Sequence, residues 1–255
     1  MQAPDGAVIV YHAIGSVSRS APHWNAFVRP ERFAAQMAYL AARRRVVDLD
    51  TLFETDSSNG PPRVAITFDD GYRDVIEYAV PLLQELGLPA TFFVPTQWIG
   101  AESGWGPLPL KLISRDDLVG LARSGFTIGS HGHAHIDYAR SEPRTVEADV
   151  RASVEQLAEL LGSGPHYLAY PYGRATPEAA REAARLGIRG AFALDRPQPL
   201  SGALAVPRVS IVPSDGTSLF ALKTAGRYIG WRHSAPVRAV YGALRPLVRN
   251  RWLWP

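Results

Sequence analysis

The sequence predicts an α/β fold, a distorted parallel (β/α) barrel of about seven strands in a single domain. Short runs of β-branched and apolar residues recur along the chain with helical patterns between them, which is the order that a parallel sheet requires. Polar clusters come directly after these runs, as they do on the active-site face of a barrel. With 255 residues the chain is long enough for one such barrel.

The composition is that of a globular protein, with 46% hydrophobic and 20% charged residues. The absence of cysteine excludes a disulfide framework and metal binding through thiolates. The net charge of +3 is mild, but Asp215 is the last acidic residue and the segment after it is strongly basic.

The start of the chain does not resemble a secretory signal, because residues 1–5 are short and polar and residues 7–10 form a strand pattern. No run approaches the roughly 18 apolar residues of a membrane-spanning helix. We therefore expect a cytoplasmic protein, with membrane association as a further option. A leader removed from the chain would leave the same pattern, so that alternative stays open.

The predicted elements alternate along the chain. Glycine or proline punctuates most of their ends. The loop 96–112 carries Trp98 and Trp105, which we expect to be exposed and either to stack on a sugar or to cap the barrel. Strands are expected at 7–11, 46–49, 64–68, 90–94, 126–129, 167–170, 190–194 and 206–212, and helices from residue 30 and over 73–86, 114–124, 144–161 and 177–186.

Two adjacent carboxylates, Asp69 and Asp70, directly follow the predicted strand 64–68. Like charges so close repel, so such a pair usually needs a cation or a proton to relieve it. The segment 130–135, with sequence SHGHAH, follows another predicted strand. One carboxylate and two imidazoles form a three-ligand site with room for water, as in metal hydrolases. The alternative is a helix cap beside a surface acid.

These motifs occur together and in order. The segment 67–72 (TFDDGY), the H-x-x-x-H pair within 130–135 and the later segment 170–173 (YPYG) resemble the polysaccharide deacetylases of carbohydrate esterase family 4, the NodB homology domain. The resemblance extends from 10–12 (VYH) to 207–209 (PRV), which is most of the chain.

The resemblance implies a role for each matching residue. Asp70, His131 and His135 take the positions of the metal ligands, and Asp69 that of the general base. Tyr172 takes the position whose backbone N–H donates to the oxyanion. A divalent metal is implied, with Zn²⁺ preferred, although nitrogen and oxygen ligands also suit Co²⁺, Ni²⁺ or Mn²⁺.

Tyr11-His12 resembles the circularly permuted branch of the family, so His12 is assigned the role of general acid, with a structural histidine at a strand end as the rival interpretation. Gly132 stands where the family often has Ser or Thr, a loss expected to loosen the loop. The motif arginine is missing, and Arg208 is the candidate replacement. His133 is expected to point elsewhere, with a structural or substrate-edge role.

The function implied is that of a metal-dependent hydrolase that removes the N-acetyl group from an amino-sugar residue of a glycan or glycan precursor. The products are acetate and a free amine, and the partner is an N-acetylated sugar or oligosaccharide. The alternatives are a hydrolase of non-acetyl or O-acyl groups with the same site, and a catalytically silent glycan-binding domain. Nucleic-acid binding rests on the basic tail alone and is not expected.

Two regions are expected: a NodB-like domain over 1–215 and a basic, aromatic C-terminal extension over 216–255. Within the extension, apolar residues recur at helical spacing over 237–248, and Trp252 and Trp254 follow. Basic residues beside tryptophans are typical of a peripheral membrane segment, and a helix that packs back on the domain has the same pattern.

Overall fold

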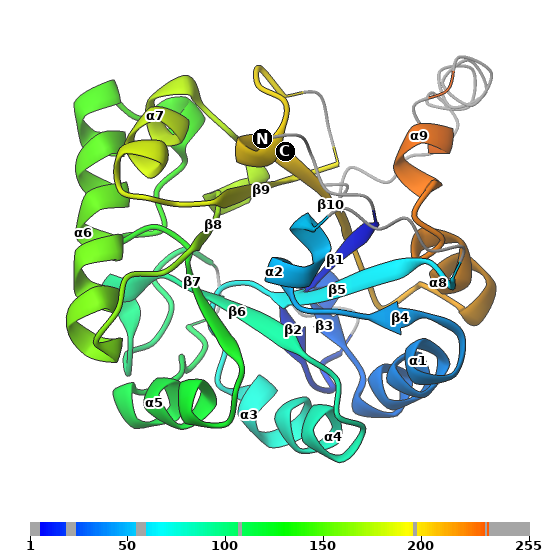
Figure 1. Ribbon diagram of the computed structural model, residues 1–255. Helices are drawn as coiled ribbons and strands as arrows, with labels where there is room; N and C mark the ends of the chain where they lie inside the picture. The colour runs from blue at the N-terminus through cyan, green and yellow to red at the C-terminus, as the bar shows by residue number, and fades with distance from the viewer. Residues whose placement is uncertain are drawn as a thin grey trace.

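The computed structural model describes residues 6–18, 24–54, 60–106, 109–195, 198–232 and 234. Seven parallel strands form a closed ring, and helices surround it (Figure 1). This confirms the predicted parallel (β/α) barrel of about seven strands. The strands of the ring are β1 (Ala7–Tyr11), β5 (Arg63–Phe68), β6 (Ala90–Val94), β7 (Thr127–Ser130), β8 (Tyr167–Ala169), β9 (Gly190–Leu194) and β10 (Val206–Ser210).

Strand β1 closes the ring because it pairs in parallel with both β5 and β10. Ile9 lies opposite Ile66 on one side and Val209 on the other. The remaining neighbours follow the chain order from β5 to β10. Three short strands lie outside the ring: β4 (Arg45–Val46), which pairs with the start of β5, and β2 (Ala13–Ile14) and β3 (Phe27–Val28), which form a separate parallel pair.

Local sequence sets the helix ends. Proline occupies the first turn of three of the longer helices, where its missing N–H leaves no bond unmade. A capping box of Ser114 and Asp117 starts the helix over residues 115–123. The helices are α1 (Pro30–Arg43), α2 (Leu49–Phe53), α3 (Asp74–Tyr78), α4 (Val80–Glu85), α5 (Arg115–Arg123), α6 (Pro143–Leu161), α7 (Pro177–Arg185), α8 (Thr217–Lys223) and α9 (Tyr228–Arg232).

Two predicted elements are wrong in detail. The expected strand 46–49 is only the two-residue β4, and helix α2 follows it because the Asp48 side chain accepts from the Thr51 N–H at 2.7 Å. The expected helix 73–86 is divided at Ala79 into α3 and α4. Pro81, in the first turn of α4, has no N–H to continue the hydrogen bonding of α3.

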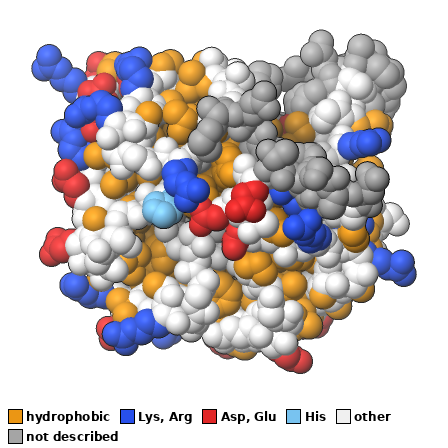
Figure 2. Space-filling model, viewed as in Figure 1, with side chains coloured by type: hydrophobic (Ala, Val, Ile, Leu, Met, Phe, Trp, Pro, Cys, Tyr) orange, Lys and Arg blue, Asp and Glu red, His pale blue; other side chains and the backbone are white. Residues whose placement is uncertain are grey.

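Helix α2 covers one end of the barrel, where the strands begin, and Figure 1 shows it near the middle of the ring. Its residues Leu49, Leu52 and Phe53 pack into a core cluster with interior side chains from several strands. Charged side chains of both signs lie around α2 and β8 on this face (Figure 2). The interior side chains in this cluster are Val8, Ala65, Phe93, Tyr167, Ala169, Phe192 and Val206.

Helix α8 packs on the barrel. Its Phe220 lies in the main core, and Arg44 donates to the Ala221 carbonyl at 2.8 Å. The boundary expected at 215, the cytoplasmic location and the membrane contact stay predictions. The helix expected over 237–248 lies outside the described residues, and within them no helix is long and apolar enough to cross a membrane.

Candidate active site

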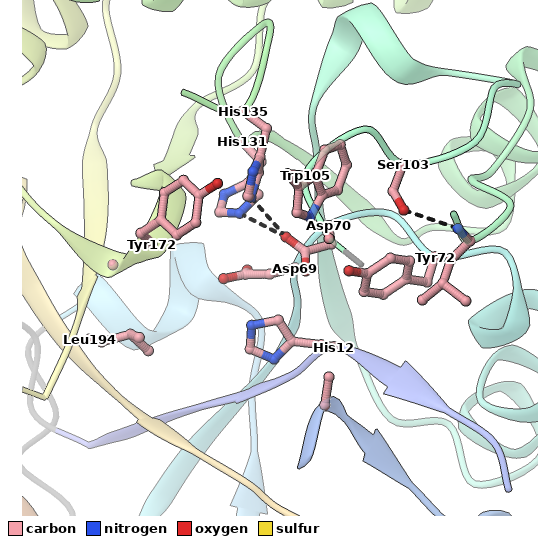
Figure 3. A pocket seen from close by; sticks show the side chains of 14 residues that line it. His12, Asp69, Asp70, Tyr72, Ser103, Trp105, His131, His135, Tyr172 and Leu194 are labelled. Carbon is pink, nitrogen blue, oxygen red and sulfur yellow. Dashed lines mark hydrogen bonds and ion pairs between the residues drawn. The ribbon is translucent and has the colours of Figure 1, made fainter. Parts of the chain in front are cut away.

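The predicted site residues all lie where barrel strands end. His12 follows β1, Asp69 and Asp70 follow β5, His131 follows β7, and Tyr172 lies shortly after β8. The carboxyl ends of parallel strands meet at one end of a barrel, so these side chains converge. Figure 3 shows them around a single space. This end of the barrel is opposite the end that α2 covers, because the strands begin there and end here.

Asp70 is the centre of the cluster. Its Oδ1 lies 3.2 Å from His131 Nε2 and 3.1 Å from His135 Nε2. One ligand atom from each of the three residues lies within 4.8 Å of the others, and all three are buried. The structure therefore brings together the three residues that the sequence pattern selects as ligands.

The donor set fits a cation. His131 Nδ1 lies 2.9 Å from the carbonyl oxygen of Ala169, which can only accept, so Nδ1 carries a hydrogen and Nε2 of the neutral ring presents a lone pair to Asp70. Two lone pairs facing each other require a positive charge between them. A histidine whose second nitrogen donates to a carbonyl is the usual arrangement for a metal ligand.

Backbone strain is concentrated here. Asp70, His135 and Tyr172 have φ of 67°, 57° and 56°, and they are the non-glycine residues with positive φ in the described part of the chain. Such a conformation is uncommon outside glycine, and residues keep it only when their surroundings determine it. His135 Nδ1 is also buried without a hydrogen-bond partner among the described atoms.

Asp69 points into the barrel, where Arg208 meets it. The guanidinium donates from Nη1 to Oδ1 at 2.7 Å and from Nη2 to Oδ2 at 2.6 Å, and Arg208 is completely buried. The rings of Phe93 and Phe192 lie 5.4 and 5.9 Å from the guanidinium carbon. The arginine proposed from sequence as a substitute charge thus contacts the candidate base directly.

The charges in the cluster shift one another. Burial alone raises the pKa of Asp69, but the charge of Arg208, with further help from His131, outweighs it and holds the pKa below its usual range. Burial also opposes ionisation of Asp70, yet hydrogen bonds from His131 and His135 lower its pKa well below the usual range. Both carboxylates are therefore ionised.

The two histidines respond differently. Burial lowers the pKa of each, but the charge of Asp69 and the hydrogen bond to Asp70 reverse the effect at His131, whose pKa is raised. At His135 burial dominates, and its pKa is lowered. The two imidazoles therefore differ in their affinity for a proton, although both contact Asp70.

Aromatic rings surround His135. Trp105 stacks on it with ring centroids 4.1 Å apart, and the Tyr172 ring lies 4.9 Å away. Trp98 packs against Trp105 at 5.7 Å and donates from its indole N–H to the Ala134 carbonyl at 3.2 Å. The two tryptophans expected to be exposed are half-buried, because they pack on the histidine loop.

The cavity at the centre is small, about 70 Å³. This is room for several waters or one small acyl group, since a single water needs roughly 10–15 Å³ of such space. His12 lies on its wall and faces Asp69 in Figure 3. His133 bonds to the Thr96 hydroxyl at 2.9 Å, as expected of a structural side chain. The walls also include Tyr72, Ser103, Leu110 and Leu194.

Sequence reasoning missed two contributors to the site. The stacking of Trp105 on His135 had no local signal beyond an aromatic loop. Asp149, whose carboxylate holds the histidine loop from α6, resembles any polar residue on an amphipathic helix. The signal that could have found it is its helical spacing from Ser153 and Gln156, which places the three polar residues on one face of α6.

Comparison with known proteins agrees with this geometry. The family model described as polysaccharide deacetylase matches residues 56–191. The chain belongs to this family, the carbohydrate esterase family 4 that its motifs resemble. A poly-beta-1,6-N-acetyl-D-glucosamine N-deacetylase of Staphylococcus aureus (strain MRSA252) is 24% identical over 201 residues, which cover 73% of this chain and 68% of the relative.

Solved structures share the fold. IcaB from Ammonifex degensii has a TM-score of 0.71 at 23% identity, over 89% of this chain and 98% of that one. The deacetylase PplD of Streptococcus pyogenes, solved in complex with acetate, has a TM-score of 0.72 at 23% identity, over 87% and 99%.

Proposed function

We propose that this protein is a metal-dependent N-deacetylase that releases acetate from an N-acetylated amino-sugar residue of a glycan and leaves a free amine. The observation that carries the proposal is Asp70 Oδ1 within 3.2 Å of two histidine Nε2 atoms, in a cavity of acyl size beside an ionised Asp69. Family membership and the N-deacetylase name of the Staphylococcus aureus relative support it.

Asp70, His131 and His135 would hold the divalent ion, with Zn²⁺ preferred and Co²⁺, Ni²⁺ or Mn²⁺ compatible with the same donors. When bound, such an ion acts as a Lewis acid and lowers the pKa of a coordinated water toward about 7. The protein fixes its ligands, since His131 is oriented by the Ala169 carbonyl.

Asp69 would act as the general base. Arg208 fixes both of its oxygens, so the carboxylate cannot rotate, and each oxygen keeps a second lone pair for the proton of the attacking water. Because its pKa is lowered, Asp69 holds an acquired proton weakly. This favours onward transfer of that proton.

Two further residues would complete the reaction. The αL conformation of Tyr172 sets the direction of its backbone N–H, which we assign to the developing oxyanion. His12, on the wall of the same cavity, would protonate the leaving amine, because an amine leaves poorly without a proton.

The test is acetate release from N-acetylglucosamine oligosaccharides, with loss of activity on chelation and recovery on addition of Zn²⁺ or Co²⁺. An Asp69→Asn variant is expected to bind the metal and release no acetate. Persistent release by this variant would overturn the assignment of Asp69, and binding of the oligosaccharide without release by the parent protein would favour the silent glycan-binding alternative.

Two measurements narrow the reaction further. Comparing an O-acetylated with an N-acetylated sugar tests the O-acyl alternative directly. A His12→Ala variant is expected to lose turnover on the amide far more than on an ester, because an alcohol leaves without the same need for a proton. Near-normal kcat of this variant on the amide would remove His12 from the reaction.

A further inference from the structure

Helix α6 carries a polar stripe beside its apolar one. Four residues of the apolar stripe that the spacing predicts are buried: Val146, Val150, Val154 and Leu157. Asp149, Ser153 and Gln156 repeat at i, i+4 and i+7, which places them on one face of the helix. All three hydrogen-bond to the loops at the ends of β6 and β7, so this face of α6 holds the loops rather than facing solvent.

Asp149 makes the most contacts of the three. It is 6% exposed, and its carboxylate accepts from the backbone N–H of His133 and of Ala134, each at 2.8 Å. A third bond comes from the Tyr138 hydroxyl, also at 2.8 Å. Burial and then the charge of Asp149 raise the pKa of Tyr138 far above its usual value, so the hydroxyl keeps its proton and donates.

The other two members of the stripe secure the flanks of the same loop. Ser153 Oγ lies 2.7 Å from Ser130 Oγ, which in turn accepts from the Gly132 N–H at 3.2 Å. Gln156 donates to the carbonyl of Thr96 at 3.2 Å. The Thr96 N–H bonds to the Gly132 carbonyl, so this contact also reaches the histidine loop.

The stripe explains why Gly132 occupies the position where the family often has Ser or Thr. A Cβ at this position would lie 2.6 Å from both Asp149 Oδ2 and the Tyr138 hydroxyl oxygen, and Gly132 has φ of +73°. The space that a side chain would fill is taken by the carboxylate from α6. The loop is therefore held from outside instead of being loosened by the glycine.

We propose that Asp149 is a positioning residue for the metal centre. The two peptide N–H groups it holds belong to the residues between His131 and His135, so it fixes the backbone that separates the two imidazoles. It also supports the chain leading into His135, which has the strained φ of 57°. The inference rests on the proposed metal-dependent function, because it assigns Asp149 to the same centre.

The test is the metal affinity of an Asp149→Asn variant, measured with Co²⁺ by visible absorption and with Zn²⁺ by competition against a chromophoric chelator. An amide has the same shape, but its NH₂ group faces donors that need an acceptor. The affinity is expected to fall about 10–100-fold, the usual effect of losing a partner that orients metal ligands. The Co²⁺ spectrum is expected to change, and kcat at saturating metal to fall less than the affinity.

Glu182→Gln is the matched control. Glu182 is an equally buried acid at 1% exposure, on the neighbouring helix α7, and it bonds to Arg151 at 2.8 Å and Arg185 at 2.7 Å. Its loss is expected to lower the melting temperature while leaving metal affinity and the Co²⁺ spectrum unchanged. A role of Asp149 in stability alone would make the two variants behave alike.

The outcomes separate the two proposals. Failure of the parent protein to bind Co²⁺ or Zn²⁺ would contradict the proposed function itself. Parental affinity and spectrum in Asp149→Asn would overturn the role of Asp149 alone. If that variant does not fold, Tyr138→Phe and Ser153→Ala decide, since each removes one bond from the stripe: both are expected to weaken metal binding several-fold, and unchanged affinity in both would overturn the proposal.

Discussion

The two ends of the barrel bury different kinds of side chain. Where the strands begin, α2 closes the ring with apolar side chains such as Leu52, which is fully buried. Where they end, Asp69, Asp70 and the two histidines are just as buried but charged or polar, and the positive-φ residues gather around them. Burial stabilises the first end and costs free energy at the second. The same degree of burial therefore stabilises the fold at the end that α2 closes, whereas at the other end it holds charged side chains together at a cost in free energy.

Arg208 joins the two ends. Its guanidinium forms the floor of the site below Asp69 and lies near the rings of Phe93 and Phe192. Phe192 also packs on Phe53 of α2, with ring centroids 6.2 Å apart. The barrel interior is thus packed continuously from the apolar side chains of α2 to the acidic cluster of the candidate site. Variants near α2 are expected to change stability, and variants near the cluster to change activity.

The largest expected effect is at Asp70. Asp70→Asn keeps the size of the side chain and its tolerance of positive φ but removes the charge of the proposed ligand. Acetate release is expected to fall roughly 10³-fold or more, because loss of a group on which the reaction depends costs far more than loss of a supporting contact. The melting temperature without metal is expected to fall at neutral pH, because the contacts with His131 and His135 that lower the pKa of Asp70 also stabilise its charged form in the fold. An unchanged or higher melting temperature would show that relief of the repulsion with Asp69 outweighs these contacts.

Arg208→Met is expected to affect both properties. Removing one partner of a buried pair leaves Asp69 uncompensated, at a cost of about 3–5 kcal/mol in the free energy of unfolding. Activity is expected to fall about 10²-fold because Asp69, the proposed base, is no longer fixed in place. Denaturant unfolding and acetate release measure the two effects.

The pH dependence of this variant follows from the lowered pKa of Asp69 in the parent. A carboxyl with a depressed pKa contributes stability above its unfolded pKa, and that contribution is lost as the pH falls through the folded pKa. The stability gap between parent and Arg208→Met is therefore expected to be widest near pH 7 and to narrow toward acid pH. The double variant Asp69→Asn/Arg208→Met is expected to recover part of the stability, and equal losses in single and double variants would contradict the pairing.

Leu52→Ala probes the opposite end. Truncation of a fully buried leucine is expected to cost about 2–5 kcal/mol of stability. The kcat of the folded protein is expected to stay within about twofold of the parent, because the site is at the far end of the strands. Thermal unfolding and acetate release well below the melting temperature test this prediction. A large fall in kcat would show that the packing of α2 sets the geometry of the site.

Much of the site was predictable because its parts have local signals. Asp70 and His131 are 61 positions apart in sequence, yet each follows a buried strand, and the ends of parallel strands meet. The barrel followed from the alternation of strand and helix patterns. The fold then determines which of these side chains contact one another in the candidate site.

The features that were missed depend on tertiary packing. Helix α2 and strands β2 and β3 are too short for a periodic signal. Arg208 was a candidate from the sequence, but its partner was not, because it lies within an apolar strand and only closure of the barrel turns it toward Asp69 rather than toward the helices. Asp149 is one polar residue of an amphipathic helix until the fold shows which loop it faces.

The smallest expected effect is at Asp74, a carboxyl at the start of α3 that forms no salt bridge within the part of the chain that the structure describes. Burial raises its pKa to about 7, although it accepts backbone hydrogen bonds from Ile14 and Val75, and its Oδ1 is buried without a partner among the described atoms. A raised acid pKa means that the folded state holds the proton more tightly, so stability falls as the pH rises from about 4, the unfolded pKa, through about 7.

Asp74→Asn cannot ionise, and its melting temperature is expected to exceed that of the parent by roughly 2–5 °C at pH 8, with the advantage shrinking toward pH 4. Glu85→Gln, at an exposed position of the following helix α4, is the control and is expected to show no such trend. A difference for Asp74→Asn that stays constant across this range would mean that Asp74 is compensated in the fold as Asp69 is by Arg208, and that buried carboxyls near the site end are paired as a rule.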